Sequence, residues 1–147
     1  MIIRRANIND LSSVVKLFDA YRVWYRKESD TETAAKFLRS RINNDESIIF
    51  VAEKGSELHG FTQLYPIFSS TRMKRMWLLN DLFVSETHRG QGLGKQLIAA
   101  AKNHCKESEA CGILLETETS NLVGNKLYQN ENFHLEANNF YFWTNDN

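Results

Sequence analysis

Three glycines alternate with other residues between positions 90 and 94, shortly after a long apolar run at 76–84. The apolar run is typical of a strand buried on both faces of a sheet. The glycines permit a tight turn, and a segment with helical periodicity follows at once. The first N–H groups of such a helix and the positive end of its dipole point into the turn, a geometry that binds phosphate. Arg89 and Lys95 add positive charge at the rim of the turn.

Two common nucleotide-binding motifs do not fit this turn. A P-loop has four residues between its glycines and a Ser or Thr after its lysine. Here Gly90 and Gly94 are one residue too close, and Gln96 stands where Ser or Thr is required. A dinucleotide fingerprint places its third glycine one residue later than Gly94. The turn is therefore a phosphate site of another kind, or a tight strand–helix junction without a ligand.

Hydrophobic periodicity predicts an α/β chain of seven strands and four helices. Helices are expected over 10–25, over 30–43 with a Ser29–Glu32 capping box, after the glycine turn, and over 121–130. Pro66 is expected to end one of the strands or to lie at a strand edge. The seven strands are expected at 2–6, 48–52, 58–65, 76–84, 113–117, 133–135 and 140–143.

Composition predicts a single domain over 1–147 with an ordinary core and no bulk charge. Acidic and basic residues number 18 each, so binding of nucleic acid or of an anionic membrane surface is not expected. No apolar run approaches the roughly 20 residues that span a bilayer, and no signal peptide is visible. Cys105 and Cys111 are expected as free thiols in the cytoplasm, and the four scattered histidines predict no metal site.

Two sequence motifs carry more information than the turn alone. The stretch Arg89-Gly90-Gln91-Gly92-Leu93-Gly94 matches the [RQ]-x-x-G-x-[GA] pyrophosphate loop of the GNAT superfamily of acetyl-CoA-dependent N-acetyltransferases. Residues 121–133 resemble the N-x-x-A-x-x-L-Y-x-x-x-G-F motif of that family. Gly124 replaces its Ala, and Asn132 replaces its Gly. Asn tolerates the left-handed conformation that this last turn needs.

The resemblance implies a GNAT fold, with a mixed, mostly antiparallel sheet of about seven strands, flanked by four helices and splayed at its central strands. It implies acetyl-CoA as the acyl donor, held by the strand before the turn, by the turn itself and by two asparagines. Tyr128 takes the position of the family's general acid. The residues implied in cofactor binding are Leu82, Phe83, Val84, Arg89, Gly90, Gln91, Gly92, Leu93, Gly94, Lys95, Asn121 and Asn125.

The sequence leaves the general base and the acceptor more open. Asp81 is expected as the base ahead of Glu86, because an apolar strand neighbourhood raises the pKa of a carboxyl; both residues are also compatible with a structural role. Aromatic rings beside carboxylates suit a small cation. The acceptor is therefore expected to be a primary amine of a small molecule, such as a polyamine or an amino acid. The residues expected to line its site are Trp24, Glu28, Tyr65, Trp77 and Asp81.

Two other functions fit the same motifs. Acetylation of a protein Lys or N-terminus would need an open groove, where a small-amine enzyme needs a closed pocket. An acyl-CoA-binding module without catalysis is the other, and both Tyr128 and the intact turn argue against it. The aromatic strand expected at 140–143 offers an edge on which a homodimer can form.

Overall fold

In the computed structural model, which describes residues 1–146, the chain divides into two units. The first unit is Met1–Glu116 and the second begins at Thr117. The prediction of one domain over the whole chain stays a prediction. The second unit contains α4 (Leu122–Asn130). The first contains β1 (Ile2–Arg5), η1 (Ile8–Asp10), α1 (Leu11–Trp24), α2 (Thr31–Asn43), β2 (Ile48–Lys54), β3 (Glu57–Ser69), β4 (Lys74–Val84), η2 (Glu86–His88), α3 (Leu93–Glu107) and β5 (Ile113–Leu114).

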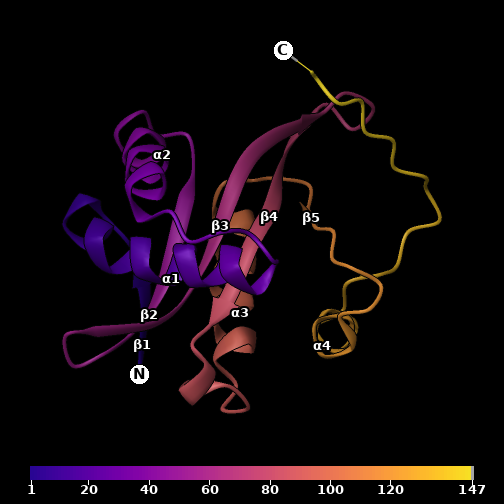
Figure 1. Cartoon of the computed structure of the whole chain (residues 1–147). Helices are drawn as coiled ribbons and strands as arrows, with labels where there is room; N and C mark the ends of the chain where they lie inside the picture. The colour runs from indigo at the N-terminus through magenta and orange to yellow at the C-terminus, as the bar shows by residue number, and fades with distance from the viewer. Residues whose placement is uncertain (147) are drawn as a thin grey trace. The chain divides into compact units, whose positions relative to one another are not determined.

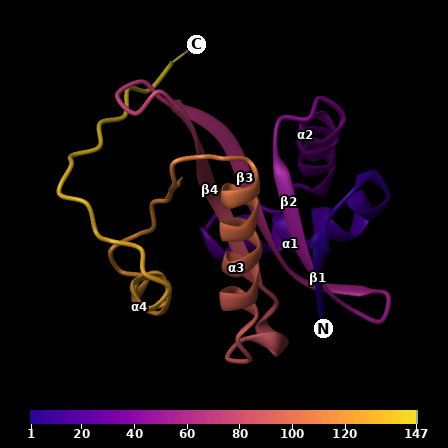
Figure 2. The same cartoon turned by 180° about the vertical axis from the view of Figure 1, so that it is seen from behind.

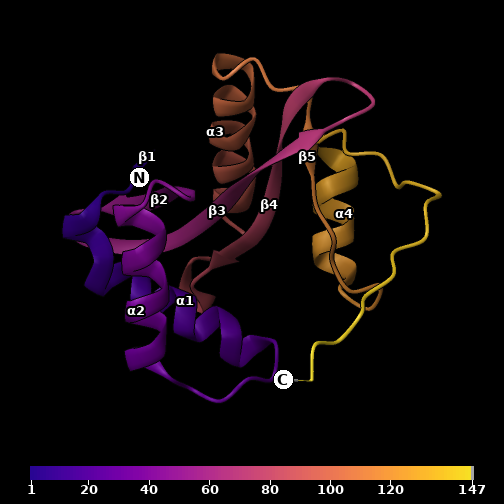
Figure 3. The same ribbon diagram turned by 90° about the horizontal axis from the view of Figure 1, so that it is seen from above.

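The first unit is built on one sheet with the strand order β1-β2-β3-β4-β5. Neighbouring strands are antiparallel except β4 and β5, which are parallel. Helices α1 and α2 cover one face of this sheet and α3 covers the other (Figures 1 and 3). The predicted α/β architecture with a mixed, mostly antiparallel sheet is confirmed.

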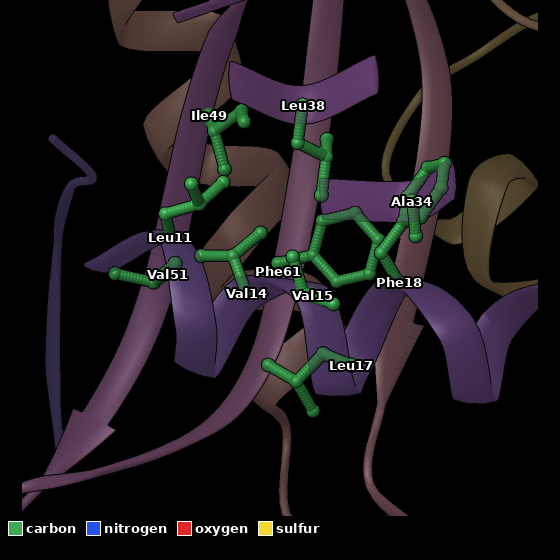
Figure 4. Packing of buried hydrophobic residues seen from close by; sticks show 10 residues of the cluster. All are labelled: Leu11, Val14, Val15, Leu17, Phe18, Ala34, Leu38, Ile49, Val51 and Phe61. Carbon is green, nitrogen blue, oxygen red and sulfur yellow. The ribbon is translucent and has the colours of Figure 1, made fainter. Parts of the chain in front are cut away.

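The core between the sheet and the two N-terminal helices is formed by apolar residues that recur at helical spacing on the helices and at every second position on the strands. Val14 and Phe18 recur at helical spacing on α1, and Val51 and Phe61 of β2 and β3 alternate with residues on the opposite face of the sheet. Figure 4 shows these side chains interdigitating with Leu38 of α2. Each large side chain buried in this way contributes about 1.5–3 kcal/mol. The helix layer is therefore fixed firmly against the sheet.

Helix α3 lies on the opposite face, along β3 and β4 (Figure 2), where a second apolar cluster holds it. Leu93 and Leu97 pack with Ala52 of β2, and Leu82 and Val84 of β4 pack against them. Because Leu93 is the first residue of α3, this cluster fixes where the helix begins relative to the end of β4.

Helix α2 begins with a different cap from the predicted capping box. Its N-cap is Asp30, whose side chain accepts a hydrogen bond from the Thr33 N–H at 3.1 Å. Ser29 instead donates its hydroxyl to Asp19 of α1 at 2.6 Å. The Asp19 carboxylate is buried and also accepts the Asp30 N–H at 2.7 Å. A carboxylate from another element thus takes the Ser29 hydroxyl, which local sequence cannot reveal.

Strand β3 does not end at Pro66 but continues to Ser69, so of the two expectations for Pro66 the strand end is wrong and the strand edge is confirmed. Pro66 lies opposite Trp77 of β4. Trp77 donates its N–H to Gly112, away from β3, at 3.1 Å. The pair is therefore a non-hydrogen-bonded one, in which both nitrogens point outward. Beyond Leu64 no described strand pairs with the outer edge of β3, so the missing N–H of proline costs no ladder bond there.

The described residues form five strands rather than about seven. The expected strand at 113–117 shortens to β5, and residues 133–135 and 140–143 carry no regular secondary structure. A strand requires a backbone partner as well as suitable side chains. Without one, the four aromatic residues Phe140, Tyr141, Phe142 and Trp143 are 65–92% exposed.

Candidate functional site

Strand β4 loses its second neighbour partway along its length. The short β5 pairs with only two residues of β4, and across 79–84 no described strand pairs on that side. Ser85 donates its N–H to His59 of β3 at 2.8 Å. Because N–H groups alternate between the two edges of a strand, those of Leu82 and Val84 face the open edge. The predicted splay is present, and the edge suits an extended ligand that pairs like an added strand.

The glycine turn follows this open edge and leads into α3. Gly90 and Gly92 have φ angles of 73° and 80°, in the left-handed region that favours glycine. A Cβ built on either residue would meet nothing within 4 Å, so the space around the turn is open. Gly92 is the N-cap of α3, no side chain caps the helix, and its first turn holds no acidic residue. The first N–H groups of α3 are therefore presented to an anion.

Arg89 fastens the turn to the end of β4. Its Nε donates to the Val84 carbonyl at 3.0 Å, and its guanidinium lies 5.4 Å from the centre of the Phe83 ring. The exposed Lys95 follows in the first turn of α3. Together with the apolar anchoring of Leu93, these contacts hold the turn between two rigid elements.

A buried carboxyl lies on β4 immediately before the residues of the open edge. Asp81 is 2% exposed, and its two oxygens accept hydrogen bonds from the Gln63 amide at 2.5 Å and from the Asn80 amide at 3.0 Å. Burial raises the pKa of Asp81 above its ordinary value, and the hydrogen bonds from Gln63, Asn80 and Tyr21 only partly oppose it. A carboxyl whose pKa is moved toward neutrality is suited to proton transfer.

A β-bulge at Asn80 decides which face of the sheet Asp81 occupies. Gln63 lies opposite Asp81 and Leu64 opposite Leu79, which leaves Asn80 without a partner in the register. Tyr21 of α1 donates its hydroxyl to the Asn80 carbonyl at 3.1 Å. The bulge is thereby tied to the α1 face of the sheet, where the Asp81 carboxyl also lies.

Trp77 lies on the other face of the sheet, away from Asp81. Its Nε1 donates to Ser108 at 2.8 Å, and its ring centre is 4.8 Å from that of His104 on α3. Positions 77 and 81 share a face in a regular strand, but one bulged residue between them reverses this relation. The expectation that Trp77 and Asp81 line one site is therefore corrected, and Trp77 belongs to the α3 face.

Aromatic rings form a row along α1 toward β4. Trp24, 47% exposed, lies 4.9 Å from Tyr25, which lies 5.0 Å from Tyr21, centre to centre. Tyr21 in turn packs at 6.3 Å from Phe83, two residues after Asp81. The row thus leads from solvent to the neighbourhood of the buried carboxyl.

Tyr65 is partly buried, whereas the other two predicted carboxylates, Glu28 and Glu86, are exposed. Tyr65 is half-buried on β3, and burial together with the charge of Asp81 raises its pKa. Glu28 is exposed between α1 and α2, and its carbonyl accepts a hydrogen bond from Arg22 at 3.0 Å. Glu86 is exposed at the start of η2. The structure therefore brings Tyr65 into the electrostatic surroundings of Asp81 and leaves Glu28 and Glu86 in solvent.

The second unit presents the downstream motif on α4. Asn121 is the N-cap and accepts the Gly124 N–H at 3.1 Å, and Asn125 donates to the carbonyls of Glu118 and Asn121. Both asparagines thus bind backbone of their own segment. Tyr128 lies 6.0 Å from Phe133, centre to centre. Asn132 has a φ of 65°, the left-handed conformation that the sequence predicted for it.

Three residues around Asp81 are missing from the sequence-based site. Gln63 belongs to the site because the strand register places it opposite Asp81, and a single sequence does not reveal that register. Asn80 belongs to the site through the bulge, and Tyr21 was one of several apolar-stripe residues on a helix. The alternating pattern of β3 placed Gln63 on the same face as Phe61, which was the one available hint.

The cysteines and the potential metal ligands of residues 1–146 form no further candidate site. Both cysteines are free thiols, with Cys105 buried and Cys111 half-buried. Within this part of the chain no three His, Cys, Asp or Glu residues are grouped to hold a metal ion. No helix of the described residues has the length and apolar character needed to cross a membrane.

Comparison with known proteins assigns a family. The acetyltransferase (GNAT) family model matches residues 14–133. An uncharacterised N-acetyltransferase of Bacillus subtilis, YhfO, is 43% identical over 90% of this chain and 89% of its own. The crystal structure of a probable acetyltransferase is 34% identical, with a TM-score of 0.94 over 100% of both chains. Streptothricin acetyltransferase of Escherichia coli is 28% identical over 83% of this chain and 70% of its own.

Proposed function

This chain belongs to the GNAT family of acetyltransferases, and we propose that it transfers acetyl from acetyl-CoA to the primary amine of a small molecule by direct attack on the thioester. One observation carries the proposal. A buried carboxyl, Asp81, lies on the same strand as the open edge and just before it. The uncapped start of α3 follows within the same strand–turn–helix segment.

The donor side of the proposed site suits an extended anionic cofactor. Acetyl-CoA, when bound, supplies an activated acetyl thioester. The backbone of 82–84 is proposed to pair with its pantetheine arm, because that edge of β4 has no described strand beside it. The N–H groups of 91–95, supported by Gly90 and the charge of Lys95, are proposed to hold its pyrophosphate. Arg89 is proposed to keep the turn closed on β4, since its side chain already binds Val84.

Asp81 is proposed as the general base. An alkylamine with a pKa near ~10 is neutral in only about one molecule in a thousand at pH 7, so a proton must be removed before attack. The raised pKa of Asp81 makes this carboxyl a better proton acceptor near neutral pH than an ordinary exposed one. The amine nitrogen then forms the amide bond as the C–S bond breaks, and it releases its second proton to solvent, which balances the proton delivered to the leaving sulfur. Tyr128 is proposed as the acid that gives its hydroxyl proton to the leaving sulfur, a role that rests on the family motif.

A small cationic amine is the proposed acceptor. The aromatic row of Trp24, Tyr25 and Tyr21 is proposed to bind the cation through its rings, and Asp81 with Tyr65 is proposed to supply polar groups at the inner end of the row. The relative named streptothricin acetyltransferase, by its name, acts on a small molecule, which supports this class. Glu28 is exposed and follows Trp24 and Tyr25 closely in the sequence. It is proposed to attract the cation before the cation enters the site.

An acetyl-CoA consumption assay tests the proposal. Thiol release is followed with polyamines, amino acids, aminoglycosides, streptothricin and Lys peptides as acceptors. Turnover is expected with one of the small amines and not with peptides. Turnover with peptides alone favours a protein acetyltransferase, and tight acetyl-CoA binding without any turnover favours a binding module. Asp81→Asn is the matched variant, and an unaltered pH–rate profile in it would remove Asp81 from the mechanism.

The proposal also includes a homodimer and a cytoplasmic location. Four consecutive exposed aromatic residues at 140–143 are uncommon on a soluble monomer, so a second copy of the chain is proposed to cover them. The two free thiols are compatible with a reducing compartment.

A further inference from the structure

We propose that Gln63 is a positioning residue of this acetyltransferase, whose side-chain amide fixes the orientation and the charge state of the Asp81 carboxyl. The inference rests on the proposed role of Asp81 as the base. Gln63 itself lies on β3 and is fully buried, and neither the donor nor the acceptor is proposed to contact it directly.

The geometry around the carboxyl leaves it a single orientation. Gln63 and Asp81 are directly opposite in the β3–β4 register, and the Gln63 Nε2 donates to Asp81 Oδ2 at 2.5 Å. Asn80 donates to the other oxygen, Oδ1, at 3.0 Å. Both donors are anchored by the strands that carry them. The plane of the carboxyl is therefore determined by two hydrogen bonds from fixed positions.

The Gln63 amide is not explained by stability. Its Oε1 atom is buried and accepts no hydrogen bond within residues 1–146. A buried acceptor without a donor destabilises the folded state, and an apolar side chain of the same length would avoid that cost. What the amide provides instead is a donor to Asp81, beside a side-chain hydrogen bond with Tyr65. Polar groups retained at a cost in stability are typical of functional sites.

The groups around Asp81 explain why the Gln63 amide has a strong effect on whether the Asp81 carboxyl is ionised. The titratable groups beside Asp81 are Tyr21 of α1 and Tyr65 of β3. The positive charge of Arg41 on α2 lowers the pKa of Tyr65. Within residues 1–146 Asp81 forms no ion pair. Only neutral hydrogen-bond donors therefore lower the pKa of Asp81 against the effect of burial, and the Gln63 amide lowers it most. Removing the Gln63 donor is expected to raise the pKa of Asp81 further.

The test compares Gln63→Met with Thr62→Val. Gln63→Met keeps the length of the side chain and removes the donor. Thr62 is also fully buried on β3 and donates to Asp81, but to its backbone carbonyl, at 2.8 Å. Thr62→Val therefore removes a buried hydrogen bond to the same residue without touching the carboxyl. Circular dichroism confirms that each variant is folded, and Gln63→Asn, which withdraws the amide by one carbon, serves as a second variant.

The pKa of Asp81 is read by ¹³C NMR of aspartate-labelled protein, with Asp81→Asn identifying the resonance. Gln63→Met is expected to raise that pKa by about one unit, Gln63→Asn is expected to change it in the same direction, and Thr62→Val is expected to leave it in place. The acidic limb of the kcat/KM profile is expected to move by the same amount. An unchanged resonance in Gln63→Met, an equal change in Thr62→Val, or a changed resonance with an unmoved limb would each overturn the proposal. Because the NMR titration needs no substrate, it stands even where the acceptor assay fails.

Discussion

Replacing Gly92 with alanine tests whether the glycine turn holds the cofactor. Gly92 has a φ of 80°, and an added Cβ would meet nothing within 4 Å. The cost of alanine there is therefore conformational and free of steric overlap, about 1–2 kcal/mol. In a domain of this size each kcal/mol lowers Tm by about 2–4 °C. Differential scanning fluorimetry is expected to show a fall of roughly 2–8 °C.

Gly55→Ala is the matched control. Gly55 lies in the turn between β2 and β3, with a φ of 66° and equally open space. The two variants are expected to lose the same stability. Gly92→Ala is expected to bind CoA at least about tenfold more weakly by calorimetry. Its Cβ would occupy the open space where the pyrophosphate is proposed to lie and so displace a phosphate oxygen from the amides, and each such hydrogen bond to a charged group contributes about 1.5–3 kcal/mol.

The comparison separates cofactor binding from backbone strain. Gly55→Ala is expected to bind CoA as the wild type does, although it is equally destabilised. If Gly92→Ala also binds CoA with wild-type affinity, the amides around this turn do not hold the pyrophosphate. The reasoning from left-handed backbone, uncapped helix and open space would then be refuted.

Three further predictions concern catalysis, pH and assembly. Tyr128→Phe is expected to lower kcat at least about tenfold with CoA binding unchanged; unchanged turnover would exclude the acid role. Because the folded pKa of Asp81 is raised, its ionisation destabilises the fold as pH rises from about 3.9 through that pKa. Asp81→Asn is therefore expected to gain in Tm over the wild type from pH 4 to pH 8, and a pH-independent difference would contradict this. Light scattering is expected to give twice the 17.1 kDa of one chain, and Phe142→Ser to give a monomer; a monomeric wild type would rule out the dimer.

Local features of the sequence predicted the parts of the site that depend on local backbone. The glycine turn, the start of α3 and the left-handed Asn132 each follow from a few consecutive residues. Their conformations are determined by which φ angles a residue tolerates. The same holds for the long helices, where the apolar stripe of α1 meets the core as its period predicts.

Features that depend on partners distant in sequence were beyond prediction. Residues 140–143 have the aromatic content of a strand, yet no described strand pairs with them. Ser29 has the spacing of a helix cap, but the buried Asp19 binds its hydroxyl instead. In both cases the local structure depends on a group far away in the sequence. The pattern of neighbouring residues cannot predict which distant group will be the partner.

The bulge at Asn80 explains why the site around Asp81 was only half predicted. Without it, strict alternation would place Asp81 on the α3 face with Trp77. With it, Asp81 faces α1 and meets Gln63, while Trp77 remains against His104. The residues after the bulge, 82–84, are also those that run along the open edge. The one extra residue of the bulge thus places the proposed base, Asp81, on the side of the sheet that carries the aromatic row. The strand residues that are proposed to pair with the donor follow directly after Asp81. Because Tyr21 binds the carbonyl of Asn80, the position of the bulge is coupled to α1, the helix that carries the proposed acceptor row.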